Sequence, residues 1–124
     1  MVKLFKLNLI IGVVFFLASC ATSMSPIKVN NTLPSMTKSR FISQSQAEEA
    51  VKSKGCKYLV KGRSYVAPIG LTAKNDLKNG AAGIDEWVQL DNGNAYVLTN
   101  YKWVRVSDNG ATQLHLDFDT MLCE

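Results

Sequence analysis

The sequence predicts a small α+β domain, in which about four antiparallel strands form a sheet backed by one main helix. Three observations lead to this prediction. Asn-Gly pairs at 92–93 and 109–110 lie between apolar runs, residues 72–84 repeat apolar side chains at helical spacing, and a cysteine lies near each end of the region. Asn-Gly readily adopts the positive φ angles of tight hairpin turns. A short helix and one disulfide complete the predicted domain.

The first twenty residues are typical of a lipoprotein signal. Lys3 and Lys6 precede an apolar run over 9–17, and two small residues separate this run from Cys20. A transmembrane helix needs about 20 apolar residues, whereas this run ends sooner and has no basic stop-transfer cluster behind it. An ordinary secretory peptide does not need cysteine at the junction. We therefore expect residues 1–19 to be a cleaved signal peptide and Cys20 to carry the lipid.

Removal of the signal lowers the net charge of the chain. The full sequence has 14 Lys and Arg residues against 10 Asp and Glu residues, and Lys3 and Lys6 leave with the signal. The mature chain then has 12 basic and 10 acidic residues, a formal charge of +2. This near-neutral charge gives little support to a nucleic acid or an anionic lipid as the partner. We expect no nucleic-acid partner.

Residues 20–40 are predicted to form a lipidated polar tether. The segment is rich in Ser, Thr, Asn and Pro, contains Pro26 and Pro34, and is interpreted as having no apolar period. Ala21 follows the lipidation site. In bacteria with two membranes an acidic residue at this position retains lipoproteins at the inner membrane, so Ala21 predicts transport to the outer membrane. The expected location is the cell envelope.

The predicted domain occupies residues 41–124 and begins with a short helix. Ser45 and Glu48 have the spacing of a capping box, with Ser45 as the N-cap, and Gly55 is a natural end for this helix. Residues 57–67 then alternate in polarity as a strand does. The short helix is therefore expected to lead directly into the first strand.

The main helix is predicted over residues 72–84, with Thr72 as its N-cap. Its apolar face consists of small and aliphatic residues at helical spacing. They are Ala73, Leu77, Gly80, Ala81 and Ile84. Gly80 costs about 1 kcal/mol relative to Ala inside a helix. A close approach between the helix and the sheet would explain a glycine at this position.

Two hairpins are predicted after this helix. The first joins strands 87–90 and 95–98, and the second joins strands 103–106 and 114–118. Each is centred on one of the two Asn-Gly pairs, which favour type I′ turns. The strands would form an antiparallel meander.

Two cysteines remain after Cys20 is assigned to the lipid, namely Cys56 and Cys123. An even pair in an exported protein predicts a disulfide. The alternatives are two free buried thiols or a metal site, but the pair lacks C-x-x-C spacing and the chain has one histidine. A disulfide would require the end of the last strand to lie beside the start of the first.

A family resemblance agrees with this organisation. Residues 73–82, followed by Trp-Val-Gln-Leu at 87–90, resemble the helix-to-strand segment of the RcsF-like outer-membrane lipoproteins and their uncharacterised small relatives. These proteins share a lipobox, a polar linker, a cysteine before the first strand, an Ala-rich helix and a late cysteine. RcsF itself uses four domain cysteines where this chain has Cys56 and Cys123, and relatives tend to have Gly-Ala-Asn where this chain has Asp-Glu at 85–86. The resemblance implies the fold and the compartment more than a stress-signalling role.

No set of residues specifies a reaction. His115 is the one histidine, and a catalytic triad would need a nucleophile beside it and an acid behind it. Asp117 and Asp119 share its expected strand face and would suit a divalent ion, but a solvated polar face is the simpler interpretation. We expect a protein that is not an enzyme and that has no cofactor or metal.

Two functions fit these expectations. The first is a non-catalytic interaction or sensing module, tethered to the outer membrane and facing the periplasm, that binds outer-membrane or periplasmic proteins. The second is a periplasmic inhibitor of a lysozyme-type hydrolase. Aromatic side chains would anchor either kind of partner, although most of them are expected in the core. The candidates are Trp87, Tyr96, Tyr101 and Trp103.

Overall fold

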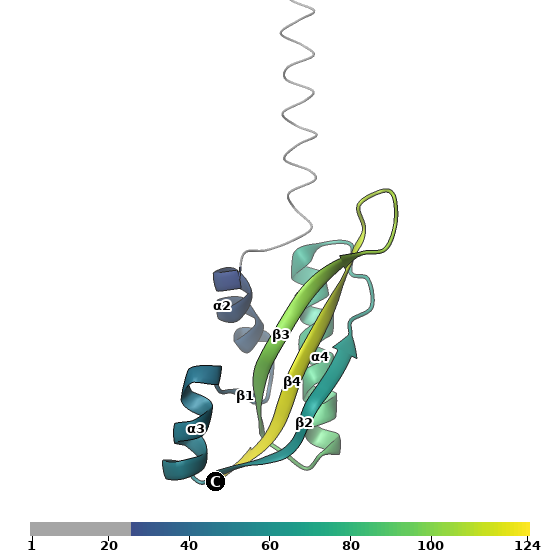
Figure 1. Cartoon of the computed structure of the whole chain (residues 1–124). Coiled ribbons are helices and arrows are strands. Elements are labelled where there is room, and N and C mark those ends of the chain that lie inside the picture. Colours follow the sequence, from purple (N-terminus) through teal and green to yellow (C-terminus); the bar gives the residue numbers. More distant parts are fainter. Residues whose placement is uncertain (1–25) are drawn as a thin grey trace, which may run out of the picture.

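A computed structural model of the chain describes residues 26–124 and contains one four-stranded sheet with helices on both faces (Figure 1). In chain order the elements are α2 (Pro26–Met36), β1 (Arg40–Phe41), α3 (Gln44–Ser53), β2 (Cys56–Val66), α4 (Ala73–Leu90), β3 (Ala95–Arg105) and β4 (Thr112–Cys123). The predicted α+β class is confirmed. The signal peptide and Cys20 lie outside the described residues.

The sheet is mixed and has the strand order β1-β3-β4-β2. Strand β4 pairs antiparallel with both β2 and β3, whereas β1 pairs parallel with β3 through Arg40 opposite Ala95 and Phe41 opposite Tyr96. The expectation of a wholly antiparallel sheet is therefore wrong at β1. The long connection from β1 to β3, which contains α3, β2 and α4, allows these two strands to run in the same direction.

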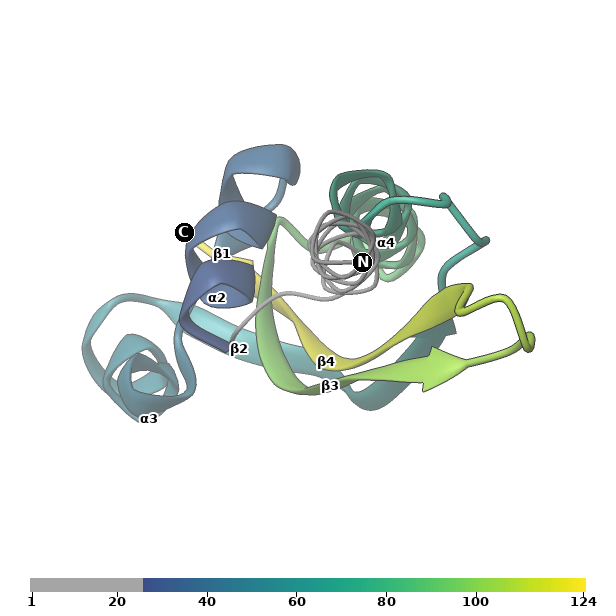
Figure 2. The same cartoon turned by 90° about the horizontal axis from the view of Figure 1, so that it is seen from above.

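The core has two parts, one on each face of the sheet, and Figure 2 shows the helices that lie on the two faces. Helices α2 and α4 cover one face, where Leu77 and Ile84 pack with Leu116 and Phe118 of β4. Helix α3 covers the other face at one end of the sheet. Its small residues pack with residues of β3 and β4 and with the two cysteines of the disulfide. This second cluster contains Ile42, Ala47, Ala50, Cys56, Ala95, Val97, Met121 and Cys123.

Helix α4 is longer than predicted, because residues 87–90 are helical and not a strand. Thr72 is confirmed as the N-cap and accepts a hydrogen bond from the Asn75 amide at 3.1 Å. Val88 is buried one turn after Ile84, so the apolar stripe of the helix continues beyond its predicted end. Helix α4 therefore takes the place of the first strand of the predicted first hairpin.

The Asn-Gly pair at 92–93 ends helix α4 and does not form a hairpin. Asn92 has a φ of 61°, and the Gly93 amide donates to the Val88 carbonyl at 2.8 Å. A left-handed residue just after a helix commonly satisfies its last carbonyls in this way. The predicted strands 95–98 and 103–106 are consequently parts of the single strand β3.

The second predicted hairpin, between β3 and β4, is confirmed. Its Val106 amide donates to the Ala111 carbonyl at 3.0 Å, and Gly110 has a φ of 89°. Asn109 does not have a positive φ, so the loop is wider than the two-residue type I′ turn that we expected. The predicted short helix corresponds to α3, which begins at Gln44 and has Ser43 and not Ser45 as its N-cap.

The predicted tether over residues 20–40 contains helix α2, which is part of the core. Val29 and Leu33 are completely buried, and Met36 packs against the same cluster. These three residues have the i, i+4, i+7 spacing of a helix face. The prediction was wrong for this part of the segment because the polar composition and Pro34 obscured the stripe. The folded domain begins before residue 41.

The glycines of α4 give a testable pair of substitutions. A side chain at Gly83 would overlap the ring of Tyr65, whereas one at Gly80 would meet mainly the movable end of Leu116. We expect Gly83→Ala to lower the free energy of unfolding by about 1–3 kcal/mol through overpacking. At Gly80→Ala the gain in helix propensity, about 1 kcal/mol, offsets a smaller repacking cost. Urea unfolding compares the two, and equal losses would contradict this account.

Candidate functional site

The predicted disulfide is present and closes one end of the sheet. Cys56 at the start of β2 lies directly opposite Cys123 at the end of β4. Their Cα atoms are 3.9 Å apart and their sulfur atoms are bonded. The alternatives of free thiols and of a metal bound by this pair are therefore excluded. The predicted lipidation site, Cys20, is not among the described residues.

The polar strand face around His115 is engaged in structural contacts. His115, Asp117 and Asp119 alternate with core residues and so lie on the face away from α4. Asp117 accepts from the Ser64 hydroxyl at 2.7 Å, and Asp119 accepts from the Gly62 amide at 2.9 Å. Among residues 26–124, no cluster of three His, Cys, Asp or Glu side chains is suited to hold a metal ion. These contacts tie β4 to β2.

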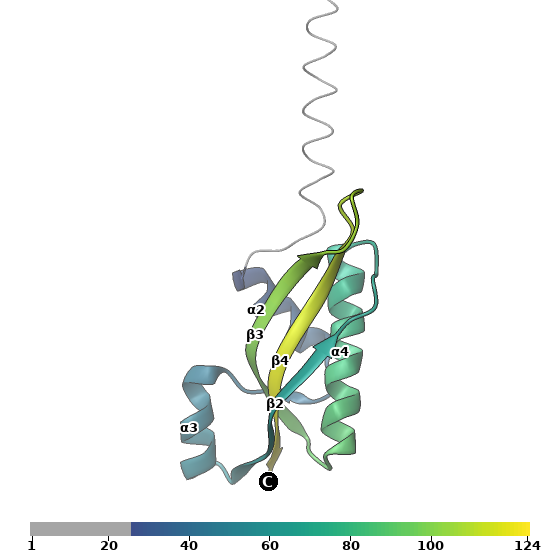
Figure 3. The same ribbon diagram turned by 45° about the vertical axis from the view of Figure 1, so that its right-hand side comes forward.

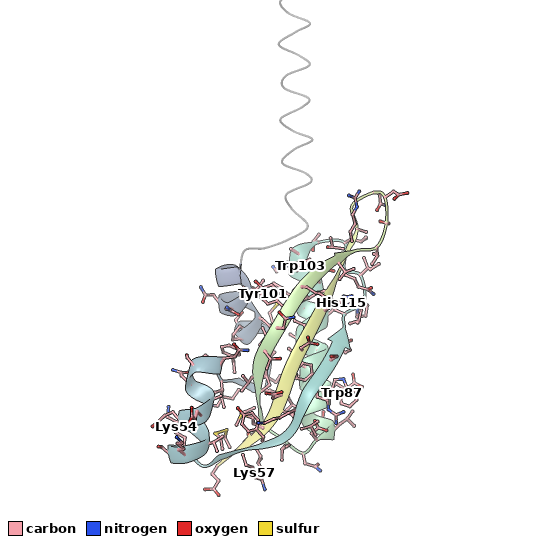
Figure 4. The ribbon with its side chains drawn as sticks, in the orientation of Figure 1. Lys54, Lys57, Trp87, Tyr101, Trp103 and His115 are labelled. Carbon is pink, nitrogen blue, oxygen red and sulfur yellow. A yellow bond between two sulfur atoms is a disulfide. The ribbon has the colours of Figure 1, made fainter. Side chains whose placement is uncertain are left out.

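The four aromatic candidates have different environments. Tyr96 is completely buried; its hydroxyl shares a hydrogen bond with Thr37 at 3.0 Å, and burial raises its pKa to about 12. The Trp87 ring lies under the guanidinium of Arg63, with 4.0 Å between the Arg63 Cζ atom and the ring centroid. Tyr101 and Trp103 are partly buried on β3 (Figure 4), and the Trp103 indole N–H lacks an acceptor among the described residues. Tyr101 and Trp103 lie in the part of β3 whose outer edge is not paired with β1.

Most of the outer edge of β3 is not paired with another strand. β1 pairs with Ala95 and Tyr96 alone, and the Ile42 amide adds one bond to the Tyr96 carbonyl. Within the part of the chain that the structure describes, no strand pairs with β3 on this side from Leu98 to Arg105. An uncovered strand edge presents backbone donors and acceptors to any extended chain that approaches it.

The hydrogen-bond alternation of β3 shows which residues face this edge. The bond from the Val106 amide to the Ala111 carbonyl closes the hairpin, and alternate residues of an antiparallel pair direct their backbone groups to the partner strand. Counting back along the register with β4, Tyr101 and Trp103 direct their amides and carbonyls away from β4. The Thr99 carbonyl also faces outward, since it accepts from the Gln44 side chain at 2.8 Å.

A groove of about 460 Å³ runs beside this edge. Its walls come from α2, from the start of α3 and from β3, and amide and hydroxyl side chains dominate them. The lining residues are Asn30, Asn31, Phe41, Ser43, Gln44, Ser45, Leu98, Thr99, Asn100 and Tyr101. The groove thus combines side-chain amides with exposed backbone groups.

This arrangement is suited to binding an extended peptide. Main-chain bonds to a strand edge supply affinity, and flanking pockets that accept alternate side chains supply specificity. The site was not predicted from the sequence. It depends on the short length of β1 and on the docking of α2 against the core. The helical spacing of Val29 and Leu33 is the one local signal that could have indicated the docking of α2.

Comparisons with known proteins add no assignment. No family model, curated protein or solved structure matches this chain. In residues 26–124 no helix has both the length and the apolar character needed to cross a membrane.

Proposed function

We propose that this chain is a lipid-anchored envelope protein whose domain is a non-catalytic interaction module. Cys20 would hold it at the outer membrane, facing the periplasm, and the domain would bind an extended segment of a partner protein along the edge of β3. The open edge beside an amide-lined groove supports binding. The lipoprotein signal that ends at Cys20 supports the location.

The bound segment would continue the line of β1. β1 runs parallel to β3 and leaves the edge after Ile42, where the chain turns into α3. A segment beyond that point can reach the outward backbone groups of Tyr101 and Trp103. Each new hydrogen bond contributes about 1 kcal/mol net, so a few of them give a weak contact. Side chains that donate to or accept from Asn30 and Asn31 would add the selectivity.

The anchor is tested by the mass of the mature protein. Intact mass spectrometry of chain extracted from membranes should show a new N-terminus at Cys20 that carries acyl chains. A Cys20→Ala variant should retain the signal peptide and lack the lipid. An unmodified Cys20 in protein from a lipoprotein-processing host would refute the proposed anchor.

The binding edge is tested by placing a photo-crosslinking amino acid at Asn31, which lines the groove, and at Gln46, an exposed residue of α3 outside the groove. We expect crosslinking to one envelope protein from position 31 and not from position 46. The crosslinked segment is then made as a peptide. It should shift the backbone amide NMR signals of Tyr101 and Trp103, and shifts confined to another face would contradict the proposal.

A blocking substitution gives the matched functional control. We expect Asn31→Trp to fill the groove and to weaken peptide binding about tenfold or more, since it removes an amide and occludes the edge. Gln46→Trp should leave binding unchanged. Isothermal titration measures both affinities. Equal affinities for the two variants would contradict binding in the groove.

The inhibitor alternative has its own measurement. Purified domain at micromolar concentration is added to a lysozyme lysis assay. The interaction-module proposal predicts no inhibition, and inhibition would make the hydrolase the partner. If inhibition persists in Asn31→Trp, the inhibitory contact lies outside the β3 edge.

A further inference from the structure

One end of the domain exposes apolar side chains on two neighbouring loops. Ile69 and Leu71 belong to the loop of residues 67–72, and Val106 begins the hairpin loop of residues 106–111. These three residues are strongly exposed: Leu71 is 80% exposed, and Ile69 and Val106 are each 43% exposed. Leu71 borders the same hollow as Asn109, Gly110 and Ala111. The two loops therefore form one continuous end surface, which we call the apolar tip.

The fold itself does not account for leucine at position 71. Leu71 has a φ of 70°, a conformation that is unfavourable for a bulky side chain and that glycine or asparagine adopts more easily. The loop is also hydrogen-bonded to the first turn of α4: the buried carboxylate of Asp76 accepts from the Gly70 amide at 2.7 Å, and the Asn75 side chain donates to the Gly70 carbonyl at 3.2 Å. These bonds hold Leu71 in an outward position without burying it.

The hairpin loop also has hydrogen bonds between a side chain and its backbone. The Arg105 guanidinium donates to the carbonyls of Ser107 and Asp108 at 3.1 and 2.9 Å. These two bonds link the Arg105 side chain to the backbone of the loop beside Val106. The tip therefore exposes three apolar side chains, those of Ile69, Leu71 and Val106, beside the exposed polar residues Asp108 and Asn109 of the hairpin loop. A surface of this mixed kind suits the boundary between headgroups and acyl chains, where apolar groups enter the acyl region and polar groups stay among the headgroups.

The chain between the lipidation site and the domain is short. Because Val29 and Leu33 fix α2 in the core, residues 21–25 alone connect Cys20 to α2. Six Cα-to-Cα steps extend to about 20 Å at most. Helix α2 starts at the same end of the molecule as the two tip loops (Figures 1 and 3). A lipid on Cys20 therefore brings the bilayer to that end.

We propose that the apolar tip rests on the bilayer that holds Cys20, with Ile69, Leu71 and Val106 inserted at the boundary between headgroups and acyl chains. This inference depends on the proposed lipidation of Cys20. The lipid supplies the affinity, and the tip sets the orientation. The domain then stands on the membrane with α3 and the disulfide at its far side, and the β3 edge remains open to the periplasm.

Hydrogen–deuterium exchange of the lipidated protein tests the contact. The protein is purified from membranes and reconstituted into vesicles of phosphatidylethanolamine and phosphatidylglycerol. The reference in solution is residues 20–124 with Cys20→Ser, expressed without the signal peptide. Burying a leucine side chain shifts an equilibrium by about tenfold or more. We therefore expect amides in 67–72 and 106–111 to exchange about tenfold more slowly on vesicles, while those of α3 remain unchanged.

Two leucine variants complete the experiment. Leu71→Asn suits the positive φ and removes the apolar group, so it should fold normally and lose the protection of both loops on vesicles. Leu90→Asn, at an exposed position (65%) at the other end of α4, should keep it. Two results would overturn the contact: exchange in the tip loops of the lipidated wild type that is no slower on vesicles, or protection of these loops in Leu71→Asn that equals that of the wild type. Intact mass of the same sample reports the lipid, so a missing anchor is recognised separately.

Discussion

Replacing both Cys56 and Cys123 with alanine is expected to lower the free energy of unfolding by about 4 kcal/mol, the largest single effect that we expect in this domain. The two cysteines are 67 residues apart in the sequence. In the chain-entropy model a crosslink over a loop of this length removes much of the conformational freedom of the unfolded chain. A domain of this size has a total stability of about 5–10 kcal/mol, so the loss would leave a marginal fold.

The local packing adds to the effect. The cluster beneath α3 is built largely from small side chains such as Ala47, Ala50 and Ala95, which bury little apolar area each. Helix α3 therefore depends on the covalent bond beside it. Without the bond, we expect α3 and the paired ends of β2 and β4 to become the least protected part of the domain.

Urea unfolding of the lipid-free mature chain measures this loss. Oxidised wild type is compared with Cys56→Ala/Cys123→Ala and with wild type in reductant, and both should show the same lowered midpoint. Cys20→Ser is the control, because it removes the third cysteine and should leave the midpoint unchanged. A double variant as stable as oxidised wild type would show that the core alone maintains the fold.

Features that depend on local chemistry could be predicted from the sequence. The N-cap at Thr72, the hairpin between β3 and β4 and the pairing of Cys56 with Cys123 agree with the structure. Each of them rests on a few residues whose conformational preferences or oxidation chemistry are strong in any context. The predicted start of the main helix was correct because the preference of Thr72 for an N-cap position is strong.

The errors arose where tertiary packing decided between local alternatives. Trp-Val-Gln-Leu at 87–90 favours a strand by composition, yet it is helical because Val88 extends the buried stripe of α4. Helix α2 has weak propensity and contains Pro34, and its position depends on α4. The carboxylate of Asp85 accepts from the amides of Lys38 and Ser39 at 2.8 and 3.0 Å, and this contact fixes the chain between α2 and β1.

The candidate site could not be predicted for the same reason. The open edge of β3 exists because β1 pairs with two residues and then leaves the sheet at Ile42. The groove exists because α2 is docked beside it. Both are long-range consequences of packing, and neither is encoded in a motif. The apolar tip is likewise assembled from loops that are distant in sequence.

A partly buried polar cluster at the end of α4 leads to the second large prediction. Asp91 accepts two bonds from the Arg63 guanidinium, at 2.5 and 3.1 Å, and one from the Thr120 hydroxyl at 2.7 Å. Arg63 in turn lies over the ring of Trp87. One carboxylate thus joins α4 to both β2 and β4, at the point where the helix ends.

Asp91→Ala is expected to lower the free energy of unfolding by about 2 kcal/mol near neutral pH, because the completely buried hydroxyl of Thr120 loses its acceptor. Chemical unfolding measures the change. Adding Thr120→Val should restore part of the loss, since both polar partners are then absent. Asp108→Ala, in the exposed hairpin loop, is the matched control and should have little effect. If Asp91→Ala lowers the free energy of unfolding equally in wild type and in Thr120→Val, the unpaired Thr120 hydroxyl does not cause the loss of stability.

The same cluster should make stability depend on pH. The hydrogen bonds from Arg63 are the main cause that lowers the pKa of Asp91 below its usual value. A carboxyl with a lower pKa in the folded chain stabilises the fold above its unfolded pKa, about 3.9, and this stabilisation is lost as the pH falls through the folded value. The stability difference between wild type and Asp91→Ala should therefore be constant from pH 5 to 7 and shrink below about pH 4. A difference that stays constant into strong acid would show that packing, and not the carboxylate charge, holds α4 against the sheet.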